Sequence, residues 1–160
     1  MASTPHTGAA TAASPAGPVL FAYDGSELAT LAIEQAGRQL AAGRTALVLC
    51  VWQPGDVGFV PIGEQHFNAA AADEVREAAE KTAAHGASLA AQAGFQSRSL
   101  AIEAAPTWKG IVEVAEERGA SLIVLGSHRR SGLVGRLLGS VAAAVVTHSE
   151  SSVLVVHQRS

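Results

Sequence analysis

Three glycines divide the chain into a repeated order of helix and strand. Gly43, Gly94 and Gly119 each follow a stretch whose composition or apolar spacing is typical of a helix, and each precedes a run typical of a strand. Alternating elements of this kind imply parallel strands joined by right-handed crossovers, with helices on both faces of the sheet. The sequence therefore predicts an α/β fold with five strands and four helices.

The expected elements can be placed from the same patterns. The expected strands are 18–23, 45–51, 96–103, 122–125 and 153–156. The expected helices begin after a cap at Asp24 or Ser26, at 69, at Pro106 and at Ser140. The third strand alternates, with Leu100 and Ile102 on one face, which is typical of an edge strand. Glycine and proline within 52–68 predict an irregular loop.

Composition limits the domain count and the location. The chain has 160 residues, of which 48% are hydrophobic and 16% charged, so we expect one globular domain over 18–158. Residues 1–17 are rich in Ala, Ser, Thr, Pro and Gly, which predicts a disordered tail. The lone cysteine, Cys50, and the lack of a basic, apolar leader indicate a cytoplasmic protein.

Charge and hydropathy exclude two classes of partner. The net charge is -3, so the chain lacks the basic field on which general affinity for nucleic acid or anionic membranes depends. No apolar run has the roughly 20 residues that a membrane span needs. We therefore expect neither a nucleic-acid partner nor a membrane.

The segment after the fourth strand has the order of parts that builds a phosphate site. A strand is followed by Gly126, then by a basic loop, and then by Gly139 and Ser140 at the start of a helix. Backbone N–H groups and the dipole of a helix N-terminus favour an anion. In an open α/β sheet this loop meets the Asp24–Gly25 turn at the point where strand order reverses, which is where ligands bind.

The ordered set of these motifs resembles the universal stress protein family. The match rests on Asp24-Gly25-Ser26, Leu49-Cys50-Val51, Gly126-Ser127-His128, Leu137-Leu138-Gly139-Ser140-Val141 and Val153-Leu154-Val155-Val156, and it covers about 18–157. The resemblance implies a Rossmann-like, single-domain, open parallel sheet with strand order 3-2-1-4-5. Many members of that family bind ATP through the pattern G-x2-G-x9-G-[S/T].

The resemblance implies a nucleotide site with a stated set of residues. Gly126, Gly139 and Ser140 match the pattern, whereas Arg129 stands where the second glycine is expected. The cofactor implied is ATP or another adenine nucleotide, with Mg²⁺ as a candidate companion. The candidate binding residues are Ala22, Tyr23 and Asp24 by the adenosine, Val51 by the adenine, and Gly126, Ser127, His128, Arg129, Arg130, Ser131, Gly132, Gly139, Ser140 and Val141 in the phosphate region.

Several side chains have two interpretations that the sequence leaves open. Arg129 could obstruct the phosphate pocket, or its guanidinium could donate to phosphate together with Arg130. Asp24 could contact a ribose or a metal, or it could form an Asx turn at the helix start. His128 could touch phosphate or lie exposed. Trp52 could line the site, although a packing role is favoured.

Three functions compete. The leading hypothesis is a stress-response regulatory protein that binds an adenine nucleotide. The alternative is a protein of the same fold that has lost nucleotide binding because of Arg129 and acts through protein contacts. A slow ATP hydrolase ranks last because the loop has no evident general base, so we do not expect an enzyme.

The last expected strand indicates the oligomeric state. Val153–Val156 is apolar on both faces at a predicted edge, which predicts a homodimer through this strand.

Overall fold

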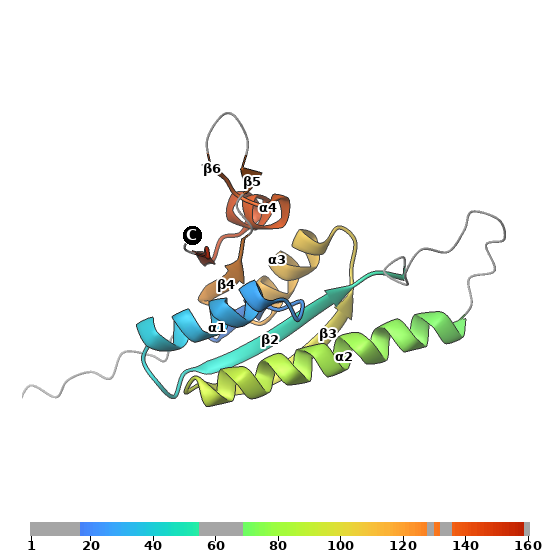
Figure 1. The fold of residues 1–160 in the computed structure, drawn as a ribbon, viewed down its shortest axis with the longest axis horizontal. Helices are drawn as coiled ribbons and strands as arrows, with labels where there is room; N and C mark the ends of the chain where they lie inside the picture. The colour runs from blue at the N-terminus through green and yellow to red at the C-terminus, as the bar shows by residue number, and fades with distance from the viewer. Residues whose placement is uncertain (1–16, 55–68, 128–129, 132–135, 159–160) are drawn as a thin grey trace, which may run out of the picture.

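A five-stranded parallel sheet forms the centre of the computed structural model, which describes residues 17–54, 69–127, 130–131 and 136–158. The strands are β1 (Val19–Ala22), β2 (Thr45–Trp52), β3 (Gln96–Glu103), β4 (Leu122–Gly126) and β7 (Ser152–Val156), in the order β3-β2-β1-β4-β7. The helices are α1 (Glu27–Gln39), α2 (Ala69–Gln92), α3 (Thr107–Glu117) and α4 (Ser140–His148). The predicted strand order 3-2-1-4-5 is confirmed, with β7 as the fifth strand (Figure 1).

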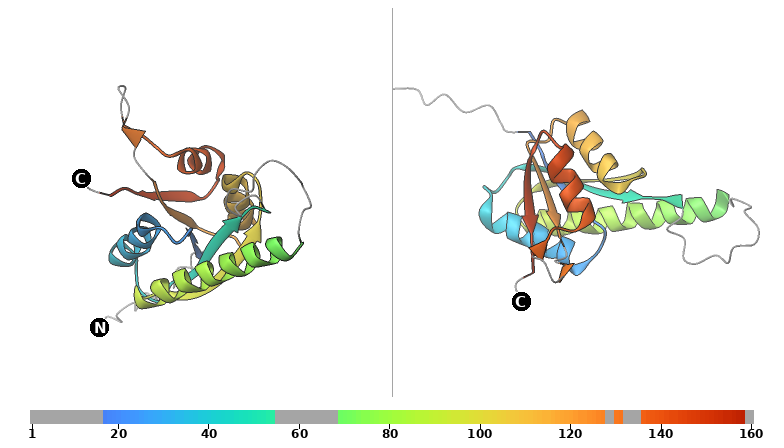
Figure 2. Two further views of the ribbon diagram at one scale, coloured as in Figure 1. Left: turned by 45° about the vertical axis from the view of Figure 1, so that its right-hand side comes forward. Right: turned by 90° about the horizontal axis from the view of Figure 1, so that it is seen from above.

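The helices cover the sheet in two layers. Strand β1 is central, and its Val19 is in register with Ala46 of β2 and Leu122 of β4. Because successive side chains of a strand point to opposite faces, the apolar runs of β1, β2 and β4 supply two separate clusters. Helices α1 and α2 pack against one face and α3 and α4 against the other, as the views in Figure 2 show.

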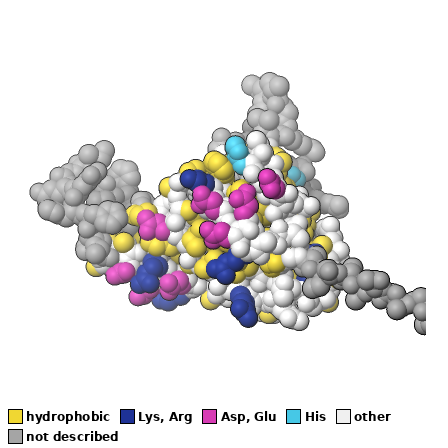
Figure 3. Space-filling view, turned by 180° about the vertical axis from the view of Figure 1, so that it is seen from behind, with side chains coloured by type: hydrophobic (Ala, Val, Ile, Leu, Met, Phe, Trp, Pro, Cys, Tyr) yellow, Lys and Arg dark blue, Asp and Glu magenta, His cyan; other side chains and the backbone are white. Residues whose placement is uncertain are grey.

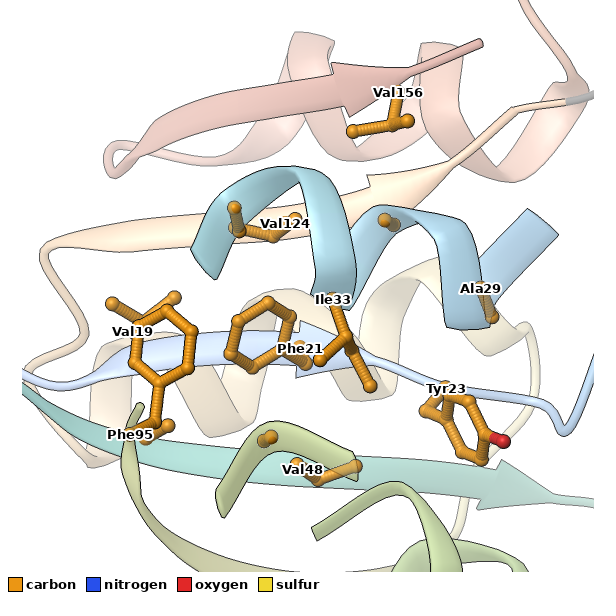
Figure 4. Close-up of a cluster of buried hydrophobic side chains, with 13 residues drawn as sticks. Val19, Phe21, Tyr23, Ala29, Ile33, Val48, Phe95, Val124 and Val156 are labelled. Atoms are coloured by element: carbon orange, nitrogen blue, oxygen red, sulfur yellow. The ribbon is translucent and has the colours of Figure 1, made fainter. Parts of the chain in front are cut away.

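The cluster under α1 and α2 contains a pair of phenylalanine rings in contact. Phe21 of β1 meets Phe95 edge-on, with ring centroids 5.2 Å apart. Val48, Val124 and Ile33 enclose this pair from neighbouring strands and from α1 (Figure 4). All five side chains are buried. Burying a side chain of this kind stabilises the fold by about 1.5–3 kcal/mol, so this layer holds α1 and α2 on the sheet.

Local signals in the sequence mark the start of α1 and the turns that follow α1, α2 and α3. Ser26 caps α1, and its Oγ accepts a hydrogen bond from the N–H of Ala29 at 3.1 Å. The dividing glycines Gly43, Gly94 and Gly119 all adopt positive φ, between 61° and 99°. Glycine adopts this conformation without steric cost, so these three residues allow the chain to turn back into the sheet at the positions that the sequence predicts.

The two edges of the sheet match the predicted edge strands. β3 pairs with β2 alone, and β7 pairs with β4 alone, in the part of the chain that the structure describes. Leu100 and Ile102 of β3 face the α3–α4 layer, as their alternation predicts. Trp52, at the end of β2, packs with Cys50 on the α2 side, so the favoured packing role is confirmed.

The loop after β4 contains a short element that the sequence did not predict. β5 (Arg130–Ser131) pairs antiparallel with β6 (Arg136–Leu137), in the register Arg130↔Leu137 and Ser131↔Arg136. This hairpin stands away from the main sheet in Figure 1. Residues 128–129 and 132–135 lie outside the described residues. Two-residue strands carry no periodic signal, which is why sequence patterns miss them.

The start of the domain is tied to the sheet. The carbonyl of Gly17, which the sequence analysis placed at the end of the tail, accepts hydrogen bonds from Ser121 Oγ at 2.7 Å and from Arg44 Nη2 at 3.4 Å. Residues 1–16 and 55–68, where a tail and an irregular loop were predicted, lie outside the described residues. The bounds 1–17 and 18–158 therefore stay predictions.

The surface shows mixed charge on one side. On the face seen in Figure 3, the described acidic side chains are interspersed with lysine and arginine rather than separated from them. The described side chains of this face thus do not build the basic field that nucleic-acid binding uses. None of the helices in the described ranges has both the length and the apolar character that crossing a membrane requires.

Candidate functional site

A pocket of about 310 Å³ opens at the carboxyl ends of β1, β2 and β4, where the strand order reverses. We call it the switch-point pocket. Its lining comes from three strand ends and the first turns of three helices. The lining residues are Ala22, Tyr23, Asp24, Ser26, Leu28, Ala29, Leu49, Val51, Thr107, Ile111, Leu125, Gly126, Ser127, Gly139, Ser140, Val141 and Ala142.

One end of the switch-point pocket is apolar. Ala22, Leu49, Val51 and Leu125 come from adjacent strands and belong to the cluster on the α3–α4 face of the sheet. Ile111 of α3 closes the same side and is buried. A flat, apolar group such as a heteroaromatic ring fits a lining of this kind. The predicted position of Val51 in the site is consistent with this arrangement.

The other end of the switch-point pocket is formed by the N-terminus of α4. Its first intrahelical hydrogen bond runs from the N–H of Ala143 to the carbonyl of Gly139, at 2.9 Å. Within the part of the chain that the structure describes, the N–H groups of Ser140, Val141 and Ala142 therefore have no partner, and the N-cap Gly139 has no side chain to cap them. Three open donors and the positive end of the helix dipole face the pocket, which suits an anion.

The N–H of Gly139 is engaged within the protein. It donates to Ser127 Oγ at 2.8 Å, so this donor is already used. Ser127 lies directly after β4 and is 3% exposed. Gly139 thus joins the helix to the end of β4, and Ser140 is the first residue of α4 with an open N–H. The predicted role of both residues in binding phosphate stays a prediction.

Gly126 is required by packing inside the protein. A Cβ placed on Gly126 would stand 2.8 Å from the carbonyl oxygen of Leu28 and 2.7 Å from its Cγ. The backbone φ of Gly126 is not positive, so conformational freedom is not the reason for glycine here. The close approach that excludes a side chain at this position comes from α1. Both residues line the switch-point pocket.

Asp24 forms the Asx turn that was one of its two interpretations. Its Oδ1 accepts a hydrogen bond from the N–H of Ser26 at 3.0 Å. The residue is exposed and also lines the pocket. The turn engages one carboxylate oxygen, so the other interpretation, contact with a ribose or a metal, stays a prediction for Oδ2.

Tyr23 contributes to the switch-point pocket through its main chain. Its ring belongs to the opposite cluster, together with Ala29 and Ile33 (Figure 4). Its hydroxyl lies 3.3 Å from Thr30 Oγ1, and its N–H donates to the carbonyl of Leu49 at 2.9 Å. The predicted placement of Tyr23 at the site therefore concerns its backbone.

The basic part of the loop is only partly described. His128, Arg129 and Gly132, all predicted site residues, lie outside the described residues. Arg130 and Ser131 are placed by their backbone in β5. The two interpretations of Arg129 therefore both stay open.

Eight lining residues were not predicted as site residues. They are Ser26, Leu28, Ala29, Leu49, Thr107, Ile111, Leu125 and Ala142. Leu49 could have been found, because it lies two positions before Val51 and so shares its face of the strand. Thr107 required the tertiary structure, which brings the start of α3 beside the end of β2. Gln53 Nε2 donates to Thr107 Oγ1 at 3.3 Å across that junction.

A resident metal centre has no support in the described part of the chain. Within those ranges no group of three His, Cys, Asp or Glu side chains could hold a metal ion. A Mg²⁺ ion held by phosphates and one carboxylate differs from such a centre, because most of its ligands come from the nucleotide and water.

Comparison with known proteins gives one consistent result. A family model described as the universal stress protein family matches residues 16–157. The universal stress protein YxiE of Bacillus subtilis is 32% identical over 148 residues, covering 86% of this chain and 97% of the relative. The structure of MJ0577 from Methanocaldococcus jannaschii has a TM-score of 0.71 at 24% identity and covers 91% of this chain and 99% of that one, which shows the shared fold.

A second solved structure adds a ligand-bound relative. It is a universal stress protein in complex with cAMP, 29% identical, with a TM-score of 0.59, covering 90% of this chain and 98% of that one. These matches span nearly all the described residues. The parallel sheet in the order 3-2-1-4-5 and the glycine–serine start of α4 agree with the expected fold. The chain belongs to the universal stress protein family.

Proposed function

We propose that this protein is a stress-response regulator that binds ATP or a related adenine nucleotide in the switch-point pocket. The observation that carries the proposal is the pairing of two unlike ends in one pocket. Val51 and Ile111 provide an apolar slot for the base, and the open N–H groups of Ser140 and Val141 provide donors for phosphate. A nucleotide combines a flat ring with an anion, so it matches both ends of the pocket.

The size and the chemistry of the pocket support the same ligand class. A volume of about 310 Å³ lies at the lower end of the range usual for small-molecule sites, about 300–1,000 Å³. Charge-assisted hydrogen bonds contribute roughly 1.5–3 kcal/mol each, so two or three of them support micromolar affinity, which needs about 8 kcal/mol with the base contacts included. The cAMP complex of a 29% identical relative is a further reason to propose an adenine nucleotide.

A bound nucleoside triphosphate would bring its own metal requirement. Mg²⁺ is usually held by phosphate oxygens, water and one or two carboxylates. Asp24 is the only carboxylate among the lining residues, and one of its oxygens is engaged by Ser26. Asp24 is therefore the residue we propose for Mg²⁺ or for the ribose hydroxyls.

The proposal is a binding function and not a catalytic one. A hydrolase needs a general base within hydrogen-bond reach of the attacking water. Asp24 is the one acidic side chain that lines the pocket in the described part of the chain, and its Asx turn orients it toward the start of α1. Occupancy of the pocket would then act through altered contacts with a protein partner.

The alternative within the same family is a protein that has lost nucleotide binding. The observation that favours it is Arg129, which stands where the family pattern has glycine. If its side chain fills the phosphate end, the protein would act through protein contacts alone. An Arg129→Gly variant separates the two readings, because affinity for ATP rises if arginine obstructs the site and falls if arginine binds phosphate.

The central experiment is a direct search for bound nucleotide. The purified protein is denatured, and the released small molecules are identified by mass spectrometry. Isothermal titration calorimetry then compares ATP, ADP, AMP and cyclic AMP. We expect a co-purified adenine nucleotide or binding in the micromolar range. Absence of both, with no thermal shift at millimolar ATP, would overturn the proposal.

We also propose that the protein is a homodimer through β7 and acts in the cytoplasm. β7 is an edge strand among the described residues, and it leaves three apolar side chains only partly buried: Val153, Leu154 and Val155. An apolar edge of this kind is a hazard unless another chain covers it. Cys50 is the single cysteine of the chain, so no disulfide can form within it, which suits a reducing compartment.

A further inference from the structure

Ser127 joins three parts of the structure around the start of α4. Its Oγ accepts the N–H of Gly139 at 2.8 Å, its own N–H donates to the carbonyl of Val156 at 3.0 Å, and its carbonyl lies 3.2 Å from His157 Nδ1. It is the one polar residue that is buried among those the structure describes. The end of β4, the end of β7 and the N-cap of α4 are therefore linked through one residue.

The link bridges the segment that contains β5 and β6. Ser127 and Gly139 are twelve positions apart, and the hairpin lies between them. Besides the apolar packing of Leu138 and Ala142 on the sheet, this hydrogen bond ties the start of α4 to the end of β4. This partly buried hydrogen bond of 2.8 Å fixes the helix start directly on the end of β4.

The hydrogen bond also leaves the donors of α4 open. In α1 the cap Ser26 uses its Oγ to accept the N–H of Ala29, so one first-turn donor is consumed. In α4 the cap is Gly139, which has no side chain, and Ser127 binds the N–H of the cap residue itself. The helix end is thus anchored while the N–H groups of Ser140, Val141 and Ala142 stay free.

We propose that Ser127 is a positioning residue for phosphate recognition, and that it acts through Gly139 rather than by contact with the ligand. This inference rests on the proposed nucleotide function. Its hydroxyl oxygen accepts the N–H of Gly139, and this bond holds the start of α4, with its open donors, at one place beside the switch-point pocket. Preorganised donors bind an anion more tightly because less ordering is needed on binding.

The test compares two ligands that differ only in phosphate. The affinities of ATP and of adenosine are measured by calorimetry for the wild type and for Ser127→Ala. Adenosine shares the base and the ribose, so the ratio of the two affinities isolates phosphate recognition. We expect Ser127→Ala to lower the ATP-to-adenosine ratio by about five- to tenfold, the range for one lost hydrogen bond.

A matched control distinguishes positioning from general stability. Ser97 Oγ donates to the carbonyl of Ala87 at 2.6 Å, in a partly buried place at the start of β3. Ser97→Ala therefore removes a comparable side-chain hydrogen bond far from the switch-point pocket. We expect this variant to keep the wild-type ratio. An equal fall of the ratio in Ser97→Ala would overturn the inference.

A second variant keeps the test valid if Ser127→Ala alone does not fold. Gly139 has φ −57° and ψ 153°, values that proline adopts. The double variant Ser127→Ala/Gly139→Pro removes acceptor and donor together, so no N–H is left buried without a partner. The same fall of the ratio is expected, with folding checked by circular dichroism.

The outcomes separate the inference from the function on which it rests. Wild-type protein that binds neither ATP nor adenosine would overturn the proposed nucleotide function. Wild-type protein that binds both, with an unchanged or higher ratio in Ser127→Ala and in the double variant, would overturn the role of Ser127 alone.

Discussion

The carbonyl oxygen of Leu28 lies 2.8 Å from the place where a Cβ on Gly126 would stand. This contact presses the first turn of α1 against the last residue of β4. Both residues line the switch-point pocket, so a side chain on Gly126 would disturb the pocket wall as well as the packing of α1. A motif glycine that could be taken as a ligand contact is therefore also a packing requirement.

Gly126→Ala is expected to destabilise the protein by about 1–3 kcal/mol, because backbone atoms of α1 must move to admit the methyl group. Urea unfolding followed by circular dichroism measures the change. Gly43→Asn is a suitable control, since no atom lies within 4 Å of a Cβ at that position and asparagine tolerates its positive φ. A Gly126→Ala protein as stable as the control would contradict the packing argument.

Ser140→Glu is expected to weaken ATP binding about tenfold or more. Ser140 is the first residue of α4 and is exposed, and a carboxylate there would occupy the region of the open donors and repel phosphate. The same charge stabilises the helix through its dipole, so the fold is retained. Calorimetry measures the affinity.

The control for Ser140→Glu is Gln96→Glu, an equal charge change at an exposed position at the start of β3. This variant should bind ATP like the wild type. Equal weakening by both variants would indicate a general charge effect and would count against phosphate binding at α4.

Ser26→Ala is expected to cost about 1 kcal/mol of stability, because the N–H of Ala29 loses its acceptor. Ser26→Asp should recover most of that loss, since a carboxylate also caps a helix and interacts favourably with its dipole. Denaturant unfolding of the three proteins provides the comparison. If alanine and aspartate behave alike, the hydrogen bond does not carry the effect.

Val155→Lys is expected to convert the proposed dimer into a monomer, because it places a charge on the β7 edge. Sedimentation at tens of micromolar measures the association state. Leu100→Lys on β3 is the matched control, since both side chains are partly buried against the same apolar cluster. A monomeric wild type, or loss of the dimer in both variants, would contradict association through β7.

The sequence predicted the architecture well, and the reason is that its signals are local. Apolar runs, helical spacing and the glycines 43, 94 and 119 each act within one turn or one strand, so they can be read without tertiary contacts. The strand order came from the family resemblance and was confirmed by the pairing of β1 with both β2 and β4. The β5–β6 hairpin was missed because two residues per strand carry no period.

The candidate site was predicted less completely, because its lining is assembled from segments far apart in the chain. The sequence by itself determined the parallel sheet, the strand ends and the glycine–serine start of α4, since these depend on local backbone preferences. Only the tertiary structure decided that Ser127 Oγ accepts a hydrogen bond from the N–H of Gly139 and that Thr107 borders the pocket. Such contacts depend on how helices pack on the sheet, which no local pattern specifies.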